Sequence, residues 1–253
     1  MRDYYKILEN PLGIGAYGEV RRCYWKKDIT NKCDRFKEYR AVKVMSKSYM
    51  EEKNIKDFQN EVDINLSLQH PNITKVHEWF EDPKRYMLVV ELINGGELFE
   101  HIQEKTDNKF DNREAGIVLK QLLSAVAYMH DERTDQHGNK WRCVHRDLKP
   151  ENILINESGD GIPEVKLIDF GTAKKFRTEK ADHPNGGSYD RAVGLQEKVG
   201  TLAYMAPEIL WLKKRGAAMK EAQARAAFDQ YFYTEKCDVW SIGVIAYVLL
   251  CGR

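Results

Sequence analysis

The chain has 253 residues, 42% of them hydrophobic and 31% charged, and a formal net charge of +1. This length allows one large domain or two lobes with a substantial core, and the near-neutral charge gives no argument for binding nucleic acid or a membrane surface. Five cysteines without a CxxC spacing argue against a disulfide framework and a zinc cage. Because the N-terminus also lacks an apolar signal segment, a reducing compartment, the cytoplasm, is expected.

The first third of the sequence predicts strands and one helix. Residues typical of strands flank a glycine-rich stretch at 12–20, which indicates a hairpin, and a further short strand is expected at 40–45. Apolar residues recur at roughly helical spacing over 56–70, as in an amphipathic helix. Residues 74–82 and 85–92 then predict a pair of strands.

Helical periodicity replaces this pattern after residue 96. Helices are expected at 97–105 and 112–130, the second with one broad apolar face. The residues predicted for that face are Ile117, Leu119, Leu122, Leu123, Val126 and Met129. We therefore predict an α+β fold with two lobes, a small β-rich N-lobe over residues 1–92 and a mostly helical C-lobe over residues 93–253.

Three polar stretches are expected on the surface. Residues 131–142 and 177–194 have the composition of loops. Residues 213–230 have high helix propensity and mostly alanine as apolar residues, which favours a solvated helix over a partner site. The most apolar run, 239–251, is shorter than the roughly 20 residues of a membrane-spanning helix, so it predicts a core helix.

Residues 12–20 read LGIGAYGEV and contain the pattern G-x-G-x-x-G-x-V. Similar glycines open dinucleotide-binding folds, but those folds need a helix directly after the glycines, and a strand is expected here. Glycines between two strands let the backbone fold down over phosphates without side-chain clash. Lys43 lies on the next clear strand and Glu61 on the predicted helix, and a lysine fixed by a glutamate can hold phosphate oxygens.

The segment 145–152 reads HRDLKPEN, and it places a base, a cation and a metal ligand within one short loop. DFG follows at 169–171 after an expected strand, and APE follows at 206–208. Together with the glycine-rich stretch and Lys43, these motifs form the protein-kinase signature in its proper order. The sequence therefore resembles the eukaryotic Ser/Thr protein kinases over essentially its full length, and several stretches are similar to the calcium/calmodulin-dependent and calcium-dependent group.

The resemblance implies a bilobal kinase fold and phosphorylation of protein Ser or Thr that depends on ATP and Mg²⁺. In that family Asp147 would accept or orient the hydroxyl proton of the substrate, and Lys149 would neutralise charge on the moving phosphoryl group. Lys43, paired with Glu61, would grip the α- and β-phosphates.

The same resemblance implies a set of ligand-binding residues. Asn152 and Asp169 would ligate Mg²⁺, a hard cation that suits oxygen ligands. The residues expected to bind ATP are Leu12, Gly13, Ile14, Gly15, Ala16, Tyr17, Gly18, Val20, Ala41, Lys43, Glu91, Ile93, Glu97 and Leu154. Val90 would be a small gatekeeper at the back of the adenine slot.

Substrate choice and activation are also expected from the resemblance. Lys149 and Thr201 fit the Ser/Thr-specific pattern, and Glu97 and Glu151 match positions that bind an arginine three residues before the target. We expect preference for R-x-x-S/T peptides, with ordinary surface carboxylates as the alternative. Glu197 would pair with the arginine of the HRD motif in place of a loop phosphate, although with less charge.

Two departures from the family pattern stand out. Asn65 occupies a position that is usually apolar, where an unpaired buried amide would cost roughly 1–3 kcal/mol. The family also continues with further helices after residue 253, so the alternative function is a truncated kinase-like nucleotide-binding module without efficient phosphotransfer, with part of the 239–251 helix exposed. Any calcium-sensing regulatory module would lie outside this chain, because no EF-hand pattern occurs.

Overall fold

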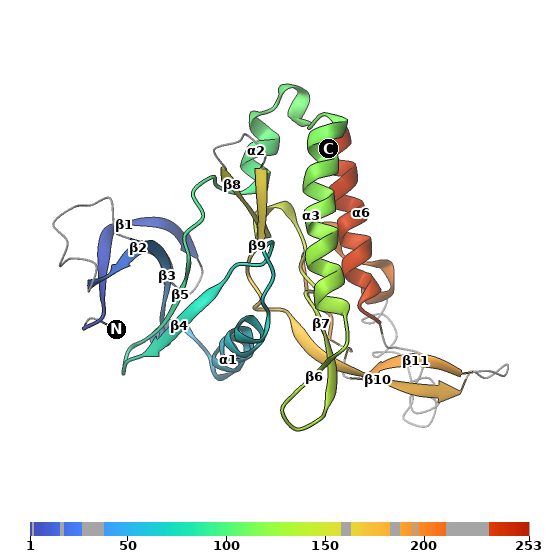
Figure 1. Ribbon diagram of the computed structural model, residues 1–253, viewed down its shortest axis with the longest axis horizontal. Helices are drawn as coiled ribbons and strands as arrows, with labels where there is room; N and C mark the ends of the chain where they lie inside the picture. The colour runs from blue at the N-terminus through green and yellow to red at the C-terminus, as the bar shows by residue number, and fades with distance from the viewer. Residues whose placement is uncertain are drawn as a thin grey trace.

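A computed structural model gives the arrangement of most of the chain (Figure 1). The described residues are 1, 3–15, 18–26, 38–157, 163–182, 188–193, 195, 197–210 and 233–252. Two of the expected ATP-binding residues, Ala16 and Tyr17, lie outside them, as does the helix predicted at 213–230.

The N-terminal part is an antiparallel five-stranded sheet in the order β1-β2-β3-β5-β4. Its strands are β1 (Tyr5–Gly15), β2 (Gly18–Trp25), β3 (Tyr39–Ser46), β4 (Val76–Glu81) and β5 (Arg85–Glu91). The predicted hairpin around the glycines is present, because β1 pairs with β2 up to Gly15 opposite Gly18. A strand thus follows the glycines directly, which argues against a dinucleotide fold.

Helix α1 (Glu52–Ser67) packs against one face of this sheet. Phe58 and Val62 bury their side chains against Tyr86 and Leu88, while the intervening Met87 lies in the core on the opposite face. This alternation is the period of two that a strand imposes. Because α1 is held by apolar contacts to the sheet, it can carry a polar residue at a fixed place beside β3.

The C-terminal part is mainly helical. Its helices are α2 (Leu98–Glu104), α3 (Asn112–His130) and α6 (Lys236–Cys251), and its short 3₁₀ turns include η4 (Thr106–Asn108), η5 (Pro150–Asn152) and η6 (Leu202–Tyr204). One further 3₁₀ turn, η3 (Lys47–Tyr49), follows β3 in the N-terminal part. α3 and α6 lie side by side (Figure 1). The buried face of α3 contains Leu122, Val126 and Met129 as predicted, but Leu123 is 48% exposed, because the true face turns through Val118 and Ala125 instead.

Short strands connect these helices to the sequence motifs. β8 (Ile153–Glu157) and β9 (Pro163–Leu167) form a hairpin, and a four-stranded sheet has the order β11-β10-β7-β6. The strands of that sheet are β6 (Arg133–Thr134), β7 (Lys140–Val144), β10 (Lys174–Asp182) and β11 (Ser188–Val193). The prediction of loops at 131–142 and 177–194 was therefore wrong for their paired parts. Their strands form by pairing with each other, with β10 bridging β7 and β11, and composition does not reveal such pairing.

An antiparallel sheet with one helix, followed by a mainly helical part, is the predicted α+β, bilobal architecture. Helix α6 is a core helix as expected, with Ile242, Ile245 and Leu249 buried against α3 and its neighbours. Among the described ranges, no helix combines the length and apolar character needed to cross a membrane.

Candidate active site

Lys43 on β3 meets Glu61 on α1. Its Nζ atom lies 3.0 and 3.2 Å from the two carboxylate oxygens of Glu61 and 3.9 Å from Oδ1 of Asp169. Burial alone would lower the pKa of Lys43, but the carboxylates of Glu61 and Asp169 raise it above its usual value. The lysine therefore stays charged, as a ligand of phosphate oxygens must.

The glycine-rich turn is shaped by its neighbours. A Cβ atom on Gly18 would lie 1.9 Å from the carbonyl oxygen of Val44, so only glycine fits there, whereas a Cβ on Gly13 would meet nothing within 4 Å. Beneath the turn is a cavity of about 380 Å³, which Gly18, Lys43 and Asp169 help to line. Three of the residues predicted to bind phosphate or metal therefore share one cavity, whereas Gly13, Gly15 and Asn152 do not line it.

Several of the predicted adenine-binding residues lie on strands. Ala41 is buried on β3 and lies opposite Val90 of β5 in the sheet. Leu154 of β8 forms a bridge with Glu97 at the start of α2. Residues far apart in the sequence are thus paired within each part of the structure.

The loop at residues 145–152, the predicted catalytic loop, is held by a buried carboxylate. Asp238 of α6 is fully buried, and its two oxygens accept hydrogen bonds from the backbone N–H groups of His145 (2.9 Å) and Arg146 (2.8 Å). His130 of α3 lies 2.9 Å from the same carboxylate. Since Arg146 has a φ of +72°, a strained conformation for a non-glycine residue, these bonds stabilise the shape of the loop.

Asp147 has both carboxylate oxygens oriented. Oδ1 accepts from the backbone N–H and the hydroxyl of Thr201, both at 2.7 Å, and Oδ2 lies 3.2 Å from Nζ of Lys149. Lys149 also donates to the Thr201 hydroxyl at 2.8 Å. Burial would raise the pKa of Asp147, but Thr201 and Lys149 lower it below its usual value. The carboxylate is therefore ionised and able to accept a proton.

Asn152 is buried, and its Nδ2 donates to the carbonyl oxygen (2.9 Å) and the carboxylate (3.2 Å) of Asp147. With the amide N–H groups used in this way, the side-chain oxygen is left as a ligand. Asp169, at a φ of +59°, supplies a half-exposed carboxylate. Within the described residues no cluster of three His, Cys, Asp or Glu side chains could hold a metal. One amide and one carboxylate nevertheless suit Mg²⁺, which keeps several waters and binds substrate phosphates.

Glu197 pairs with the catalytic loop from the stretch between the DFG and APE motifs, residues 169–208, which is named the activation segment. Its Oε2 lies 2.9 Å from Nη1 of Arg146 and 3.3 Å from Nζ of Lys174. Burial alone would raise the pKa of Glu197, but these two cations lower it below the usual value. The geometry is the one expected for an acid in place of a loop phosphate.

Tyr233, which the sequence did not single out, joins the same cluster. Its hydroxyl accepts from Nη1 of Arg146 at 3.1 Å and donates to the backbone oxygen of Glu197 at 3.0 Å. The only sequence signal was its place just before the DVW stretch of α6, and 87 residues separate it from Arg146, so no local pattern predicts the contact.

An acidic group lies at the start of α2. Burial raises the pKa of Glu97, and the nearby carboxylates of Glu100 and Glu151 raise it further. One oxygen of Glu151 is buried without a hydrogen-bond partner. Carboxylates that raise one another's pKa attract a cation, so this group is suited to bind a basic side chain.

The departure at Asn65 causes no unpaired donor. The amide is buried, and its Nδ2 donates to the backbone oxygen of Glu61 one turn earlier in α1 at 3.0 Å. Phe170 of the DFG motif is also buried, with its ring centroid 5.0 Å from that of His145. The expected loss of stability from this position is therefore reduced.

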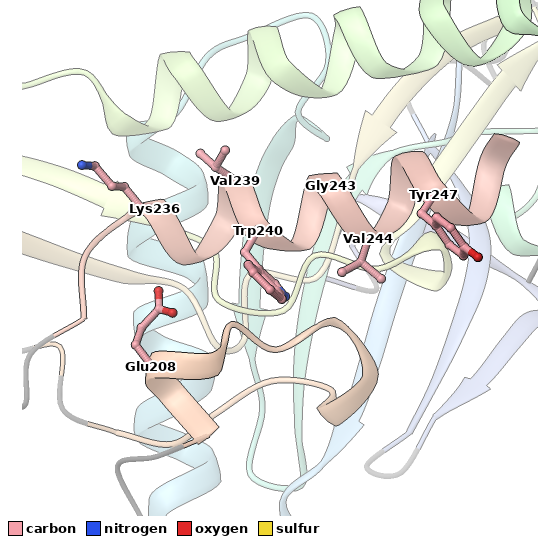
Figure 2. A pocket seen from close by; sticks show the side chains of 7 residues that line it. All are labelled: Glu208, Lys236, Val239, Trp240, Gly243, Val244 and Tyr247. Atoms are coloured by element: carbon pink, nitrogen blue, oxygen red, sulfur yellow. The ribbon is translucent and has the colours of Figure 1, made fainter. Parts of the chain in front are cut away.

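A second cavity, of about 860 Å³, lies along α6 away from these groups. Figure 2 shows Trp240 and Val244 extending from one side of the helix, with the carboxylate of Glu208 facing it. Trp240 and Tyr247 are 50% and 54% exposed. Part of the apolar surface of this helix is therefore open, as the sequence predicted.

Comparisons with known proteins agree with the geometry. A family described as protein kinase domain matches residues 7–253. Calcium-dependent protein kinase 3 of Plasmodium yoelii yoelii is 36% identical over 253 residues, which are 100% of this chain and 37% of that protein. Calcium/calmodulin-dependent protein kinase type 1 of Macrobrachium nipponense is 35% identical over 246 residues, 97% of this chain and 56% of that protein. The chain thus spans less than two thirds of each of these relatives.

Proposed function

Because the chain belongs to the protein kinase family and resembles its calcium-dependent and calcium/calmodulin-dependent members, we propose that it transfers the γ-phosphoryl group of ATP to Ser or Thr in protein substrates. The observation that carries the proposal is Asp147, an ionised carboxylate held beside Lys149 and Thr201. A group that must accept or orient a hydroxyl proton needs that charge state and a fixed position.

Each of the predicted catalytic residues has a separate role in the proposed reaction. The substrate hydroxyl gives its proton to Asp147 as its oxygen bonds to the γ-phosphorus, and the bond from that phosphorus to the β-phosphate oxygen breaks. Lys149 neutralises charge on the moving group, and Lys43, fixed by Glu61, holds the α- and β-phosphates. Protein kinases use a divalent metal in general, and Mg²⁺ held by Asn152 and Asp169 would neutralise phosphate charge. The protein's contribution is mostly positioning and electrostatics.

We further propose that substrates carry an arginine three residues before the target. Support comes from Glu97 and Glu151, whose carboxylates lie close enough to raise the pKa of Glu97. A guanidinium that paired with the Glu97 carboxylate would relieve that repulsion. The names of the relatives also support, as a proposal, regulation by a calcium-sensing module outside these residues.

The test is transfer of labelled phosphate from ATP to a peptide containing R-x-x-S. The wild-type protein is expected to label it, and Asp147→Asn, which keeps the size of the side chain, is expected to lose at least about 100-fold in rate. Undiminished labelling by Asp147→Asn would refute the assigned role. Binding of ATP without transfer by the wild type would instead favour a nucleotide-binding module.

The arginine preference has its own control. Glu97→Gln is expected to lower kcat/KM for the R-x-x-S peptide about tenfold, as expected for a lost charge-assisted contact, and to leave an A-x-x-S peptide unaffected. If both peptides are equally good substrates for the wild type, the preference is wrong while the kinase activity stands.

A further inference from the structure

Tyr233 lies where three separate parts of the chain meet. Its side chain is 2% exposed and packs with Leu195, Phe176 and Cys237 in a small apolar cluster. Only its hydroxyl reaches polar groups, namely Nη1 of Arg146 in the catalytic loop and the backbone oxygen of Glu197 in the activation segment.

The hydroxyl of Tyr233 both donates and accepts a hydrogen bond. It donates to the carbonyl of Glu197, so the acceptor it offers to the Arg146 guanidinium is its own oxygen. Burial raises the pKa of Tyr233 although Arg146 lowers it, which keeps the proton in place for the bond to Glu197. Phenylalanine would fill the same space but could make neither bond.

Both hydrogen-bond partners of the Tyr233 hydroxyl are connected through the chain to Asp147 or to a residue that contacts it. Arg146 precedes it in the chain, and its Nε is also bonded to the backbone oxygen of Thr172 at 2.6 Å. Glu197 lies four residues before Thr201, which donates twice to Oδ1 of Asp147. A shift of either partner therefore moves a group that contacts the proposed base.

We propose that Tyr233 is a positioning residue that locks the activation segment onto the catalytic loop through its hydroxyl, so that Thr201 and Asp147 stay in register for phosphotransfer. The inference rests on the proposed kinase function for its effect on rate, but its structural part is independent of activity. Tyr233 does not line the cavity beside Gly18 and Asp169 and does not pack with Lys43. Loss of its hydroxyl should therefore lower the rate of peptide phosphorylation without weakening ATP binding.

The test compares Tyr233→Phe with Tyr86→Phe. Tyr86 is also a buried tyrosine, but it packs in the core between α1 and the N-terminal sheet, so its replacement is the matched control for a lost hydroxyl. Tyr233→Phe is expected to lower kcat for an R-x-x-S peptide about tenfold with KM for ATP within about twofold of wild type. Tyr86→Phe is expected to leave both unchanged.

A second readout does not require catalysis. Hydrogen exchange of the backbone amides of residues 197–205 is expected to become about tenfold faster in Tyr233→Phe and to be unchanged in Tyr86→Phe. Unchanged exchange in Tyr233→Phe would overturn the inference, even if the wild-type protein proved to be inactive.

A double-mutant cycle with Glu197→Gln separates positioning from general stability. If the hydroxyl acts by holding the Glu197 segment against Arg146, the two changes are expected to be non-additive, with the double variant little worse than the single ones. Fully additive losses in kcat, or a loss shared equally by ATP binding and peptide phosphorylation, would mean that Tyr233 serves only the stability of the fold.

Discussion

Replacing Gly200 with alanine is expected to disrupt the contact between the activation segment and the catalytic loop. Gly200 has a φ of +108°, and a Cβ atom placed on it would lie 2.4 Å from the backbone oxygen of Arg146. The obstructing atom is backbone, which cannot rotate away as a side chain can. Either the segment before Thr201 or the loop that carries Asp147 must therefore shift.

The backbone conformation of Gly200 and the close contact of the added Cβ atom together determine how much stability is lost. An unfavourable backbone conformation for a residue with a Cβ costs of order 1–3 kcal/mol, and overpacking by one methyl group costs about 1–3 kcal/mol. Gly200→Ala is thus expected to lower the free energy of unfolding by about 2–6 kcal/mol. Because displacement of catalytic groups by about 1 Å can cost about 100-fold in rate, peptide phosphorylation should fall to a similar extent.

The assays are urea unfolding followed by circular dichroism and phosphate transfer to the R-x-x-S peptide. Gly116→Ala is the matched control, because Gly116 lies in α3, is exposed, and would present its Cβ to open space. That variant should gain roughly 0.5–1 kcal/mol from reduced backbone entropy and keep its activity. A Gly200→Ala protein as stable and as active as wild type would refute the reasoning.

Three further changes test the charged groups. Lys43→Met is expected to lower phosphotransfer at least about 100-fold while circular dichroism shows a folded protein; activity near that of wild type would contradict the phosphate role. Asp238→Asn is expected to lower the free energy of unfolding, measured with urea, by about 2–4 kcal/mol, because one backbone N–H loses its acceptor at a buried site. A decrease below about 0.5 kcal/mol would contradict the stabilising role of the Asp238 carboxylate. The pKa of Glu197 is lower in the folded state than its ordinary value of 4.5, so ionised Glu197 stabilises the folded state at pH values above 4.5. This stabilisation is lost as the pH falls through the lowered pKa. The stability difference between wild type and Glu197→Gln should therefore shrink between about pH 7 and pH 3, and a constant difference would refute the pairing.

The sequence predicted the elements whose signals are local. Stretches typical of strands predicted β4 and β5, helical spacing predicted α1, and the glycines marked the β1–β2 turn. The pairing of Lys43 with Glu61 also followed from motif order, because each residue lies on an element that could be predicted on its own. Local periodicity is enough where burial on one side decides the pattern.

Non-local pairing accounts for what was missed. β10 and β11 contain many polar residues, and they form strands because β10 pairs with β7 through Lys174 to Phe176. Tyr233 contacts Arg146 across 87 residues. In α3 the helix was correct but Leu123 was assigned to the wrong face, since which residues a helix buries depends on how its neighbours pack against it.

These long-range contacts bear on activation. Besides the β10–β7 pairing, the activation segment is held by the ion pair between Glu197 and Arg146 and by the hydrogen bonds of Thr201 to Asp147. The guanidinium of Arg146 already bonds Thr172, Glu197 and Tyr233. An added phosphate would have to displace Glu197 to reach it. We therefore expect full activity without loop phosphorylation, and treatment of the purified protein with a phosphatase should leave its rate unchanged; a loss of rate would mean that Glu197 does not replace a phosphate.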